Sequence, residues 1–450
     1  MHATQMRRLR RWRWTRIFQV LGVAVLIVGL AACGTSAQGP GQTAANASPT
    51  SKLPATSSTA QASPTTSPSN ASPTMNASPT ASASPMTGTV PGAVPVGAQG
   101  NDAWALTASR FLLTTDQGAH WASTALPVGF TGNGTAAAMV SPDGALWLLS
   151  AAGSTASIYH AAGPDSPWTK ISINLIWPAP TQTQGSYQYV PPGVDFAAFG
   201  SSAPGIVTAV VTEGNTGLAG LVLVSTDGGK TFAQHDPPML YGDWHPAFIS
   251  ATTGVIVGSG VSSGGATPTP ELDAIYSTTD GGASWQPVAL PGYSEPKVSL
   301  LGTPLVVGSH TYVTANTPTV NGRSLALYVS DNGQSFTLQG TVAVPEVNTN
   351  AAPLLGVNGS SVWMLTGSPS GTSSIYESTN SGVGWTATLT SALKPAFATL
   401  AISLNSSSSA MIWLQVSSCT AYKTNCASSE ELLATADGGH QWQQVSVPTQ

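Results

Sequence analysis

The chemistry that this sequence could perform begins with its carboxylates, because all 19 Asp and Glu residues lie from residue 102 onward. Hydrolysis of a glycan needs two carboxylates on opposite sides of the scissile bond, one of them with a raised pKa. Five acids belong to a recurring turn, and Asp143 lies in an Asp-Gly turn. Among the other acids, the candidates for such a pair lie in predicted loops and are Asp195, Glu213, Asp243, Glu271, Asp273, Glu295, Glu430 and Glu431. A glycoside hydrolase is therefore one interpretation.

Aromatic side chains offer a second kind of chemistry, binding without catalysis, because sugars and peptides pack against exposed rings. Two predicted loops concentrate such residues. The candidate ligand-face residues are Trp177, Tyr187, Tyr189, Tyr241, Asp243, Trp244 and His245. The alternative is that these aromatics fold back over their own strands. No Ser or Cys with the surroundings of a nucleophile accompanies His245, so His245 is assigned no catalytic role.

The charge balance excludes several partners. From residue 102 onward, seven Lys and Arg stand against 19 Asp and Glu, a net charge of −12. So acidic a body repels phosphate backbones, which argues against nucleic acid as a partner. No Gly-rich loop follows a strand and opens a helix, so we expect no nucleotide and assign no cofactor.

Two cysteines, Cys419 and Cys426, lie close together in a polar stretch. In an exported protein such a pair is expected to form a disulfide that closes the loop between them. Two thiols without a nearby His do not complete the four ligands of a zinc site, so no metal is assigned.

A repeated hairpin must position all of these residues. The motif Asp/Asn-x-Gly-x-x-Trp/Phe recurs with a period of about fifty residues. Its first and last members are Asp116 and Trp121, Asp227 and Phe232, Asp280 and Trp285, Asp331 and Phe336, Asn380 and Trp385, and Asp437 and Trp442. One interval is double, and a degraded copy that ends in Trp168 lies within it, which makes seven units.

Each unit has room for four short strands, two before the hairpin and one on either side of its turn. Four strands per period of about fifty residues is typical of a β-propeller blade. The sequence therefore predicts an all-β fold, a seven-bladed propeller of four-stranded antiparallel blades. The expected blades are 89–127, 128–177, 190–237, 238–292, 293–345, 350–392 and 396–449. We expect the ring to close by side-by-side packing, which does not require strand exchange between the termini.

The motif resembles the Asp-box, or BNR repeat, of a propeller superfamily that includes sialidases, xyloglucan-degrading hydrolases, sortilin-like receptors and photosystem II assembly factors. The resemblance implies a structural turn between the third and fourth strands of each blade, on the face opposite the usual active site. It also implies an arginine triad for a sialidase, and only Arg110 and Arg323 lie in this body. Xyloglucan hydrolases use a cleft between two propellers, and the assembly factors carry a basic patch that this body lacks.

The N-terminus reads as a targeting segment. A basic stretch ends at Arg16, an apolar run of 16 residues follows, and Leu30-Ala31-Ala32-Cys33 resembles the lipobox of bacterial lipoproteins. The run is shorter than the roughly 20 residues that span a bilayer. We expect a signal peptide over 1–32, lipidation of Cys33, a disordered Ser/Thr/Ala/Pro-rich tether over 33–88, and the propeller over 89–450. The alternative is an ordinary signal peptide or a membrane anchor, with Cys33 incidental.

These features together predict a lipid-anchored protein on the bacterial cell surface. Its expected role is that of a non-catalytic binding or scaffolding propeller for a protein or glycan ligand. Two alternatives remain open, a carbohydrate-active hydrolase and a role like that of the photosystem assembly factors.

Overall fold

The computed structural model divides the chain into two compact units, Met1–Pro79 and Thr80–Gln450. The structure describes residues 90–91, 96–131, 136–177, 194–213, 220–238, 243–259, 261–262, 269–270, 274–293, 300–319, 322–344, 353–367, 373–389, 398–421 and 424–448, all in the second unit. The predicted signal peptide, Cys33 and the tether lie outside these ranges.

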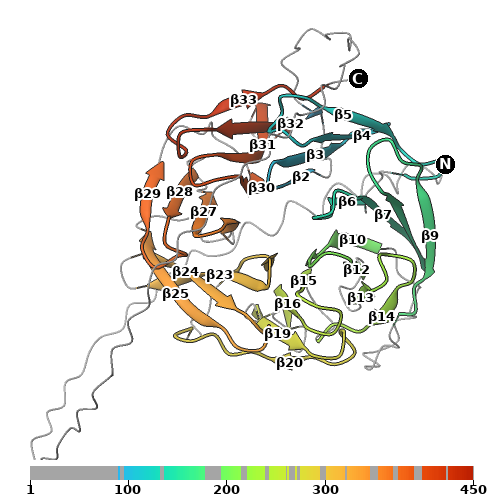
Figure 1. The fold of residues 1–450 in the computed structure, drawn as a ribbon, viewed down its shortest axis with the longest axis horizontal. Coiled ribbons are helices and arrows are strands. Elements are labelled where there is room, and N and C mark those ends of the chain that lie inside the picture. The colour runs from blue at the N-terminus through green and yellow to red at the C-terminus, as the bar shows by residue number, and fades with distance from the viewer. Residues whose placement is uncertain are drawn as a thin grey trace, which may run out of the picture. The chain divides into compact units, whose positions relative to one another are not determined.

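Seven antiparallel blade sheets follow one another around an axis, which confirms the predicted seven-bladed propeller (Figure 1). Blades 1 to 3 contain β2 (Val96–Gln99), β3 (Asp102–Leu106), β4 (Arg110–Thr114) and β5 (Ala122–Ala125); β6 (Ala136–Val140), β7 (Leu146–Ala152), β8 (Thr155–Ala161) and β9 (Thr169–Asn174); and β10 (Val194–Phe199), β12 (Val207–Glu213), β13 (Gly220–Ser225) and β14 (Ala233–His235).

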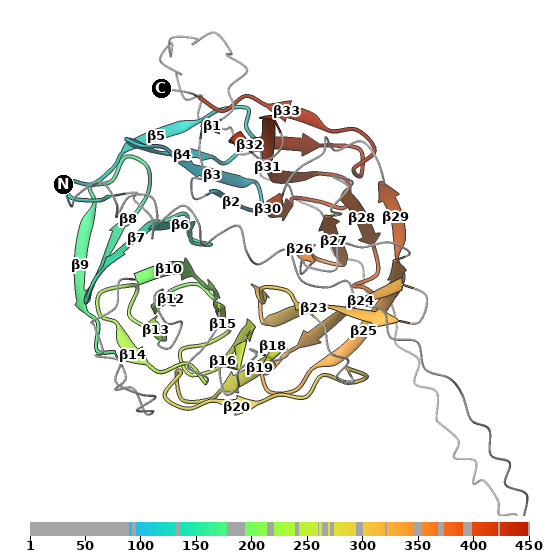
Figure 2. The ribbon, with the colours of Figure 1, turned by 180° about the vertical axis from the view of Figure 1, so that it is seen from behind.

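Blades 4 to 7 complete the ring (Figure 2). They contain β15 (Asp243–Phe248), β16 (Gly254–Ser259), β19 (Ala274–Thr278) and β20 (Gln286–Pro287); β21 (Leu300–Leu301), β22 (Leu305–Val307), β23 (His310–Thr319), β24 (Gly322–Ser330) and β25 (Thr337–Val344); β26 (Leu354–Asn358), β27 (Ser361–Gly367), β28 (Ser373–Ser378) and β29 (Thr386–Leu389); and β30 (Ala398–Leu404), β31 (Ala410–Ala421), β32 (Thr424–Thr435) and β33 (Gln443–Val445).

The strands of a blade differ in burial according to their place in the sheet. All six residues of β13, a third strand, are buried, whereas three of the four residues of β5, a fourth strand, are exposed. Third strands are covered on both faces by the neighbouring blades, which explains their nearly continuous apolar runs. Fourth strands lie at the outer rim (Figure 1), where one edge has no neighbour.

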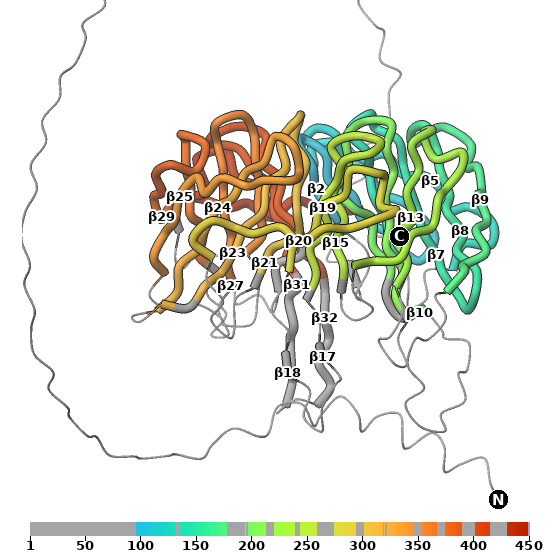
Figure 3. The backbone as a smooth tube through the Cα atoms, turned by 90° about the horizontal axis from the view of Figure 1, so that it is seen from below, coloured from blue at the N-terminus to red at the C-terminus, as the bar shows by residue number. Residues whose placement is uncertain are grey.

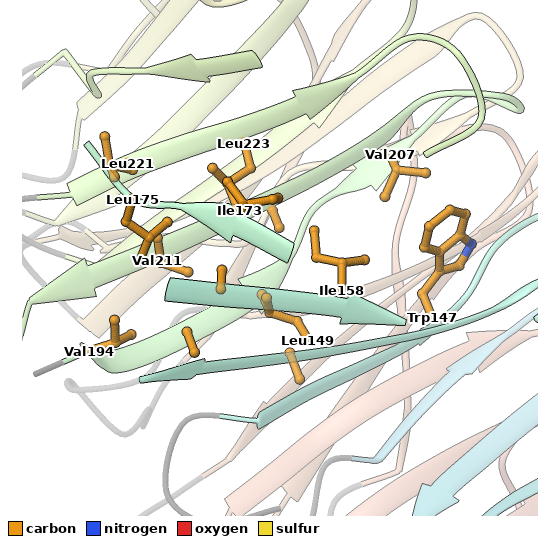
Figure 4. Close-up of a cluster of buried hydrophobic side chains, with 14 of the residues drawn as sticks. Trp147, Leu149, Ile158, Ile173, Leu175, Val194, Val207, Val211, Leu221 and Leu223 are labelled. Carbon is orange, nitrogen blue, oxygen red and sulfur yellow. The ribbon is translucent and has the colours of Figure 1, made fainter. Parts of the chain in front are cut away.

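The hydrophobic core lies between blades. One cluster joins Trp147, Leu149 and Ile158 of blade 2 to Val211 and Leu223 of blade 3 (Figure 4). Complete burial of one such aliphatic side chain contributes about 1.5–3 kcal/mol. Each blade therefore depends on its neighbours for most of its stability.

Hydrogen bonds also cross from blade to blade. Trp104 Nε1 donates to Ala138 O at 3.3 Å, joining blades 1 and 2, and Thr314 Oγ1 donates to Pro353 O at 3.1 Å, joining blades 5 and 6. Asn358 Nδ2 joins blades 6 and 7 by donating to Leu404 O at 3.2 Å. These bonds satisfy buried polar groups and set the position of each blade against the next.

The ring closes between blades 7 and 1. Trp413 Nε1 of β31 donates to Gly97 O of β2 at 3.0 Å. In addition, β1 (Val90–Pro91) pairs antiparallel with β32 at Glu430 and Ser429. The expected side-by-side closure is therefore supplemented by an N-terminal segment that joins the last blade. A two-residue pairing leaves no hydrophobic pattern by which the sequence could reveal it.

Besides β1, three more short strands lie outside the four-strand pattern, and in blade 5 both β21 and β22 pair with β23 in the place of a single first strand. The strand β11 (Ser201–Ser202) pairs in parallel with β15, and Ser201 Oγ accepts a hydrogen bond from Val306 N at 2.9 Å. The strands β17 (Val261–Ser262) and β18 (Thr269–Pro270) pair with each other, between β16 and β19 in chain order. The side view of the ring in Figure 3 shows the blades at a common level. Across the described ranges, no helix is long and apolar enough to cross a membrane.

Candidate functional site

The repeated acidic turns connect the third and fourth strands of their blades, and their carboxylates bond to the turn itself. Asp227 Oδ1 accepts hydrogen bonds from Thr231 N at 3.0 Å and Lys230 N at 2.9 Å, and its Oδ2 accepts one from Thr231 Oγ1 at 2.6 Å. Asp280 accepts the same pair of bonds from Ser284 N and Ser284 Oγ. These acids hold the hairpin rather than face a substrate.

The same bonds hold these carboxylates ionised. The Ser284 hydroxyl, followed by the Ser284 amide and the Thr278 hydroxyl, lowers the pKa of Asp280 to about 2. Donation from the Thr231 hydroxyl and amide likewise holds the pKa of Asp227 well below its usual range. A general acid needs a raised pKa, so this environment opposes acid catalysis.

In blade 5 the structure differs from the motif assignment made from the sequence, which began the copy at Asp331. Asn332, not Asp331, accepts the hydrogen bond from Ser335 N, at 3.0 Å. Asp331 instead points outward, with its side chain 80% exposed, and its Oδ1 lies 2.6 Å from His310 Nδ1. The turn between Ser330 and Phe336 is one residue shorter than its counterparts, which moves the bonding position to the next residue. The assignment of Asp331 to the motif is corrected to Asn332.

The aromatic residues of the motif point toward the preceding blade. Trp168 Nε1 donates to Ala125 O of blade 1 at 2.9 Å, and Trp285 Nε1 donates to Asp236 O, after blade 3, at 3.2 Å. Trp442 packs on Trp363 of blade 6, with ring centroids 6.4 Å apart. The motif therefore stabilises the contacts between blades as well as its own hairpin.

A hydroxyl two residues before the acid completes the turn, and the sequence reasoning missed it. Ser225 Oγ donates to Asp227 Oδ1 at 2.8 Å and accepts a hydrogen bond from Gly229 N at 2.8 Å. The same pair of bonds occurs at Thr114, Thr278, Ser378 and Thr435. The signal was available, because every full copy carries a Ser or Thr near this position.

Two of the predicted ligand-face aromatics pack against the core. Trp244 is 0% exposed in β15 and packs with Val210, Phe248 and Ile256. Trp177 packs against the cluster between blades 2 and 3. Trp244 follows the alternative in which the aromatics fold back over their own strands. The assignment of Trp244 to a ligand face is therefore wrong, whereas that of Trp177, which is only partly buried, stays a prediction.

The other candidates of that face are only partly placed. His245 is half-buried in β15. Asp243 begins this strand, and nothing is described of its side chain. Tyr187, Tyr189 and Tyr241 lie outside the described residues.

Among the candidate acids of a hydrolase, the pairing of β10 with β12 makes Asp195 and Glu213 backbone neighbours, because Val194 is the register partner of Glu213. Glu430 and Glu431 are 0% and 7% exposed in β32. Asp195 and Glu213 are placed by backbone only, in β10 and β12, and Glu271, Asp273 and Glu295 lie outside the described residues.

The two arginines of the body lie in different blades. Arg110 NH1 donates to Ser123 Oγ at 3.1 Å in blade 1, whereas Arg323 is buried in blade 5 and donates to Asn316 O at 3.0 Å. They therefore do not form the beginning of a carboxylate-binding cluster.

Cys419 and Cys426 face each other as backbone partners in the β31–β32 hairpin. This register is compatible with the predicted disulfide, which stays a prediction. Among the residues whose side chains are described, no group of three or more His, Cys, Asp or Glu could hold a metal ion.

A cavity of about 590 Å³ lies where the ring closes, on the side of the acidic turns. Residues 117–119 of blade 1 line one part of it, and residues 434–437, 441 and 443–446 of blade 7 line the rest. We call it the closing-junction groove. The sequence signals for it were present but unused: a Gln at 117, where four other copies carry Gly, and the Gln-Trp-Gln-Gln run at 441–444.

Comparison with known proteins gives neither a matching family model nor a matching curated protein. Solved structures do resemble the chain. A polysaccharide lyase of family PL25, an ulvan lyase, is 10% identical, covers 80% of this chain and 98% of its own, and has a TM-score of 0.47.

Two further similar structures are YCF48 bound to a D1 peptide and the GH74 enzyme of Niastella koreensis. YCF48 is 14% identical over 69% of this chain and 84% of its own, with a TM-score of 0.36. The GH74 enzyme is 15% identical over 79% of this chain and 66% of its own, with a TM-score of 0.32. At these identities the fold assignment rests on the order of the strands in the sheets: the chain is a seven-bladed β-propeller.

Proposed function

We propose that this protein is a lipid-anchored propeller on the bacterial cell surface, where it binds or scaffolds a protein or glycan ligand. The observation that carries the proposal is that the carboxylates of the acidic turns form hydrogen bonds with their own turns. Asp227, Asp280 and Asp437 each accept several hydrogen bonds from their own turn, which lowers their pKa values. They serve the scaffold, and a rigid scaffold suits a binding role.

The connections between blades support the same function. Hydrogen bonds join blade 1 to blade 2, blade 5 to blade 6, and blade 7 back to blade 1. A ring held in this way presents its surface without reorganising, which reduces the entropy lost when a ligand binds.

The N-terminal sequence supplies the location. A lipid on Cys33, followed by the Ser/Thr/Ala/Pro-rich stretch 34–88, would hold the ring at the membrane and let it reach outward. One acyl chain binds a membrane weakly, whereas several chains on one cysteine give a stable anchor.

The test uses the full chain, purified in detergent and immobilised through a C-terminal tag. It is titrated in parallel with purified wall polysaccharide and with soluble envelope proteins from the native host. The expected result is saturable binding of one of the two fractions, with no new reducing ends or unsaturated sugars in the polysaccharide. Absence of saturable binding to both, or steady release of such products, overturns the proposal.

A further inference from the structure

The junction at which the ring closes lacks a contact that the turn tryptophan makes at two other junctions. At two other junctions, Trp168 and Trp285 donate their indole N–H to a carbonyl at the outer rim of the preceding blade. Trp121 holds the same place in blade 1, where the preceding blade is blade 7. Its buried Nε1 has no hydrogen-bond partner among the described residues.

The missing bond does not mark a site by itself, because Trp385 Nε1 also lacks a partner within the described part of the chain. The closing junction adds the groove of about 590 Å³. This volume falls within the range of about 300–1,000 Å³ that is usual for sites of small ligands. The closing junction therefore has space for a small ligand.

Gln117 gives one wall of the groove a fixed shape. Its φ is 61°, a left-handed conformation that four other copies of the turn give to Gly228, Gly281, Gly333 or Gly438. Its Oε1 accepts a hydrogen bond from Ser409 Oγ of blade 7 at 2.8 Å. A long amide side chain thus takes the place of glycine and bridges the two blades beside the groove.

The opposite wall carries three more amides. Gln441 precedes Trp442, and Gln443 and Gln444 begin β33, where both are exposed. The floor is tight, because a Cβ on Gly118 would lie 2.1 Å from Val445 Cγ1. Primary amides of blade 7 therefore line the groove, whereas the Gln117 amide is bonded to Ser409 Oγ and, at 3.4 Å, to Asn101 Oδ1.

The groove has the chemistry of a site for hydroxyl groups. The amides of Gln441, Gln443 and Gln444 each carry two N–H donors and one carbonyl acceptor, which matches sugar hydroxyls that donate and accept at once. Asp437 adds a carboxylate, and the lining residues include no Lys and no Arg. An anionic ligand would therefore meet a negative charge without a counter-ion.

We propose, building on the binding function above, that the closing-junction groove binds a neutral oligosaccharide of two or three sugar units. A peptide fits less well, since peptide ligands are held mainly by large apolar or aromatic anchors in pockets. The apolar lining here consists of Ala and Gly with Val445, which offers no pocket for such an anchor.

The proposal is tested by calorimetric titration of the full chain in detergent with chitotriose, cellotriose and maltotriose, and with trigalacturonic acid as the anionic comparison. Gln443→Ala removes one amide from the groove, and Ala119→Trp fills it from an exposed position. Gln286→Ala is the matched control, because Gln286 follows Trp285 in blade 4 as Gln443 follows Trp442, and it is exposed away from the groove.

We expect at least one neutral trisaccharide to bind and trigalacturonic acid not to bind. Gln443→Ala should weaken that binding about three- to tenfold, the range for loss of one neutral hydrogen bond. Ala119→Trp should weaken it by at least about tenfold, and Gln286→Ala should leave it unchanged. Gln444→Ala replaces Gln443→Ala if the latter lowers the thermal unfolding midpoint.

Each other outcome contradicts the groove. Trisaccharide binding that survives Ala119→Trp places the site elsewhere and leaves the general binding function intact. Binding of trigalacturonic acid in preference to the neutral sugars contradicts the charge argument. Absence of binding by all probes at millimolar concentration overturns the groove proposal, while the envelope titration decides separately whether the protein is a binding module.

Discussion

At the scale of single residues, the turn of blade 5 shows that the motif read from the sequence and the hydrogen bonds in the structure select different residues, Asp331 and Asn332. Asn332 accepts the turn hydrogen bonds from Gln334 N and Ser335 N, whereas the Asp331 side chain is 80% exposed beside His310. We expect Asn332→Ala to lower the unfolding free energy by about 1–3 kcal/mol, because two exposed turn amides each lose a hydrogen bond worth about 0.5–1.5 kcal/mol. Asp331→Ala should cost at most about 1 kcal/mol, as is usual for an exposed ion pair. Urea unfolding of both variants measures this, and equal losses would contradict the reassignment.

The acidic turns also predict how stability depends on pH. The folded state lowers the pKa of Asp280 to about 2, whereas the carboxyl of an unfolded chain titrates near about 3.9. The stabilisation is therefore complete above pH of about 4 and is lost as the pH falls toward about 2. Asp280→Asn should differ in stability from the wild type most above pH 4, with the difference shrinking toward pH 2. Urea midpoints across this range test it, and a constant difference would rule out the linkage.

At the scale of the strand and turn, neighbouring glycines of one hairpin have different roles. Gly229 has φ +83°, and a Cβ there would lie 2.1 Å from Trp147 Cη2 of the preceding blade. Gly228 has φ +71° and no atom within 4 Å of a built Cβ. Gly228→Ala should therefore cost only the left-handed strain, about 1–2 kcal/mol. Gly229→Ala should cost about 1–3 kcal/mol more, because Trp147 must also move. Thermal and urea unfolding compare the two, and similar losses would show that the contact between the blades yields easily.

The strand β15 shows why the ligand face was misread. Read as a loop, Tyr241 to His245 suggests exposed rings, but the strand starts at Asp243, and its alternation turns Trp244 into the blade. Trp244 pairs across the sheet with Gly258, where a Cβ would lie 2.0 Å from its ring. A glycine opposite an aromatic residue was the available clue, but it required the register, which one sequence does not supply.

Trp244→Ala distinguishes a core residue from a ligand contact. Removal of a fully buried tryptophan should lower the unfolding free energy by about 3–5 kcal/mol. Urea unfolding gives this loss directly. A variant with wild-type stability would return Trp244 to the surface and invalidate its placement in the core.

At the scale of the whole molecule, the repeat was readable because its period survives variation in single residues. Counting the degraded copy that ends in Trp168 gave seven blades, and the structure has seven blade sheets. The closure was not readable, since β1 contributes two residues to blade 7 and leaves no pattern. The groove also required the structure, because it depends on residues of blades 1 and 7 that lie at opposite ends of the sequence.

The predicted anchor concerns the molecule as a whole. Cys33→Ser removes the thiol that would accept the lipid, so the protein should pass from the membrane fraction to the soluble fraction of the native host. Fractionation followed by immunoblotting measures the shift, with Cys419→Ser as a cysteine control that should stay with the membrane. Retention of the Cys33→Ser protein in the membrane would contradict lipid anchoring.

Equilibrium binding tests the central claim, that this propeller binds an envelope ligand, most directly. The full chain, immobilised in detergent, is titrated with wall polysaccharide and with envelope proteins. The bound ligand is then recovered, and its molecular mass is compared with its mass before binding. The account predicts a saturable isotherm for one of these fractions and recovery of the bound ligand intact. No saturation with either fraction, or recovery of shortened glycan chains, would contradict it.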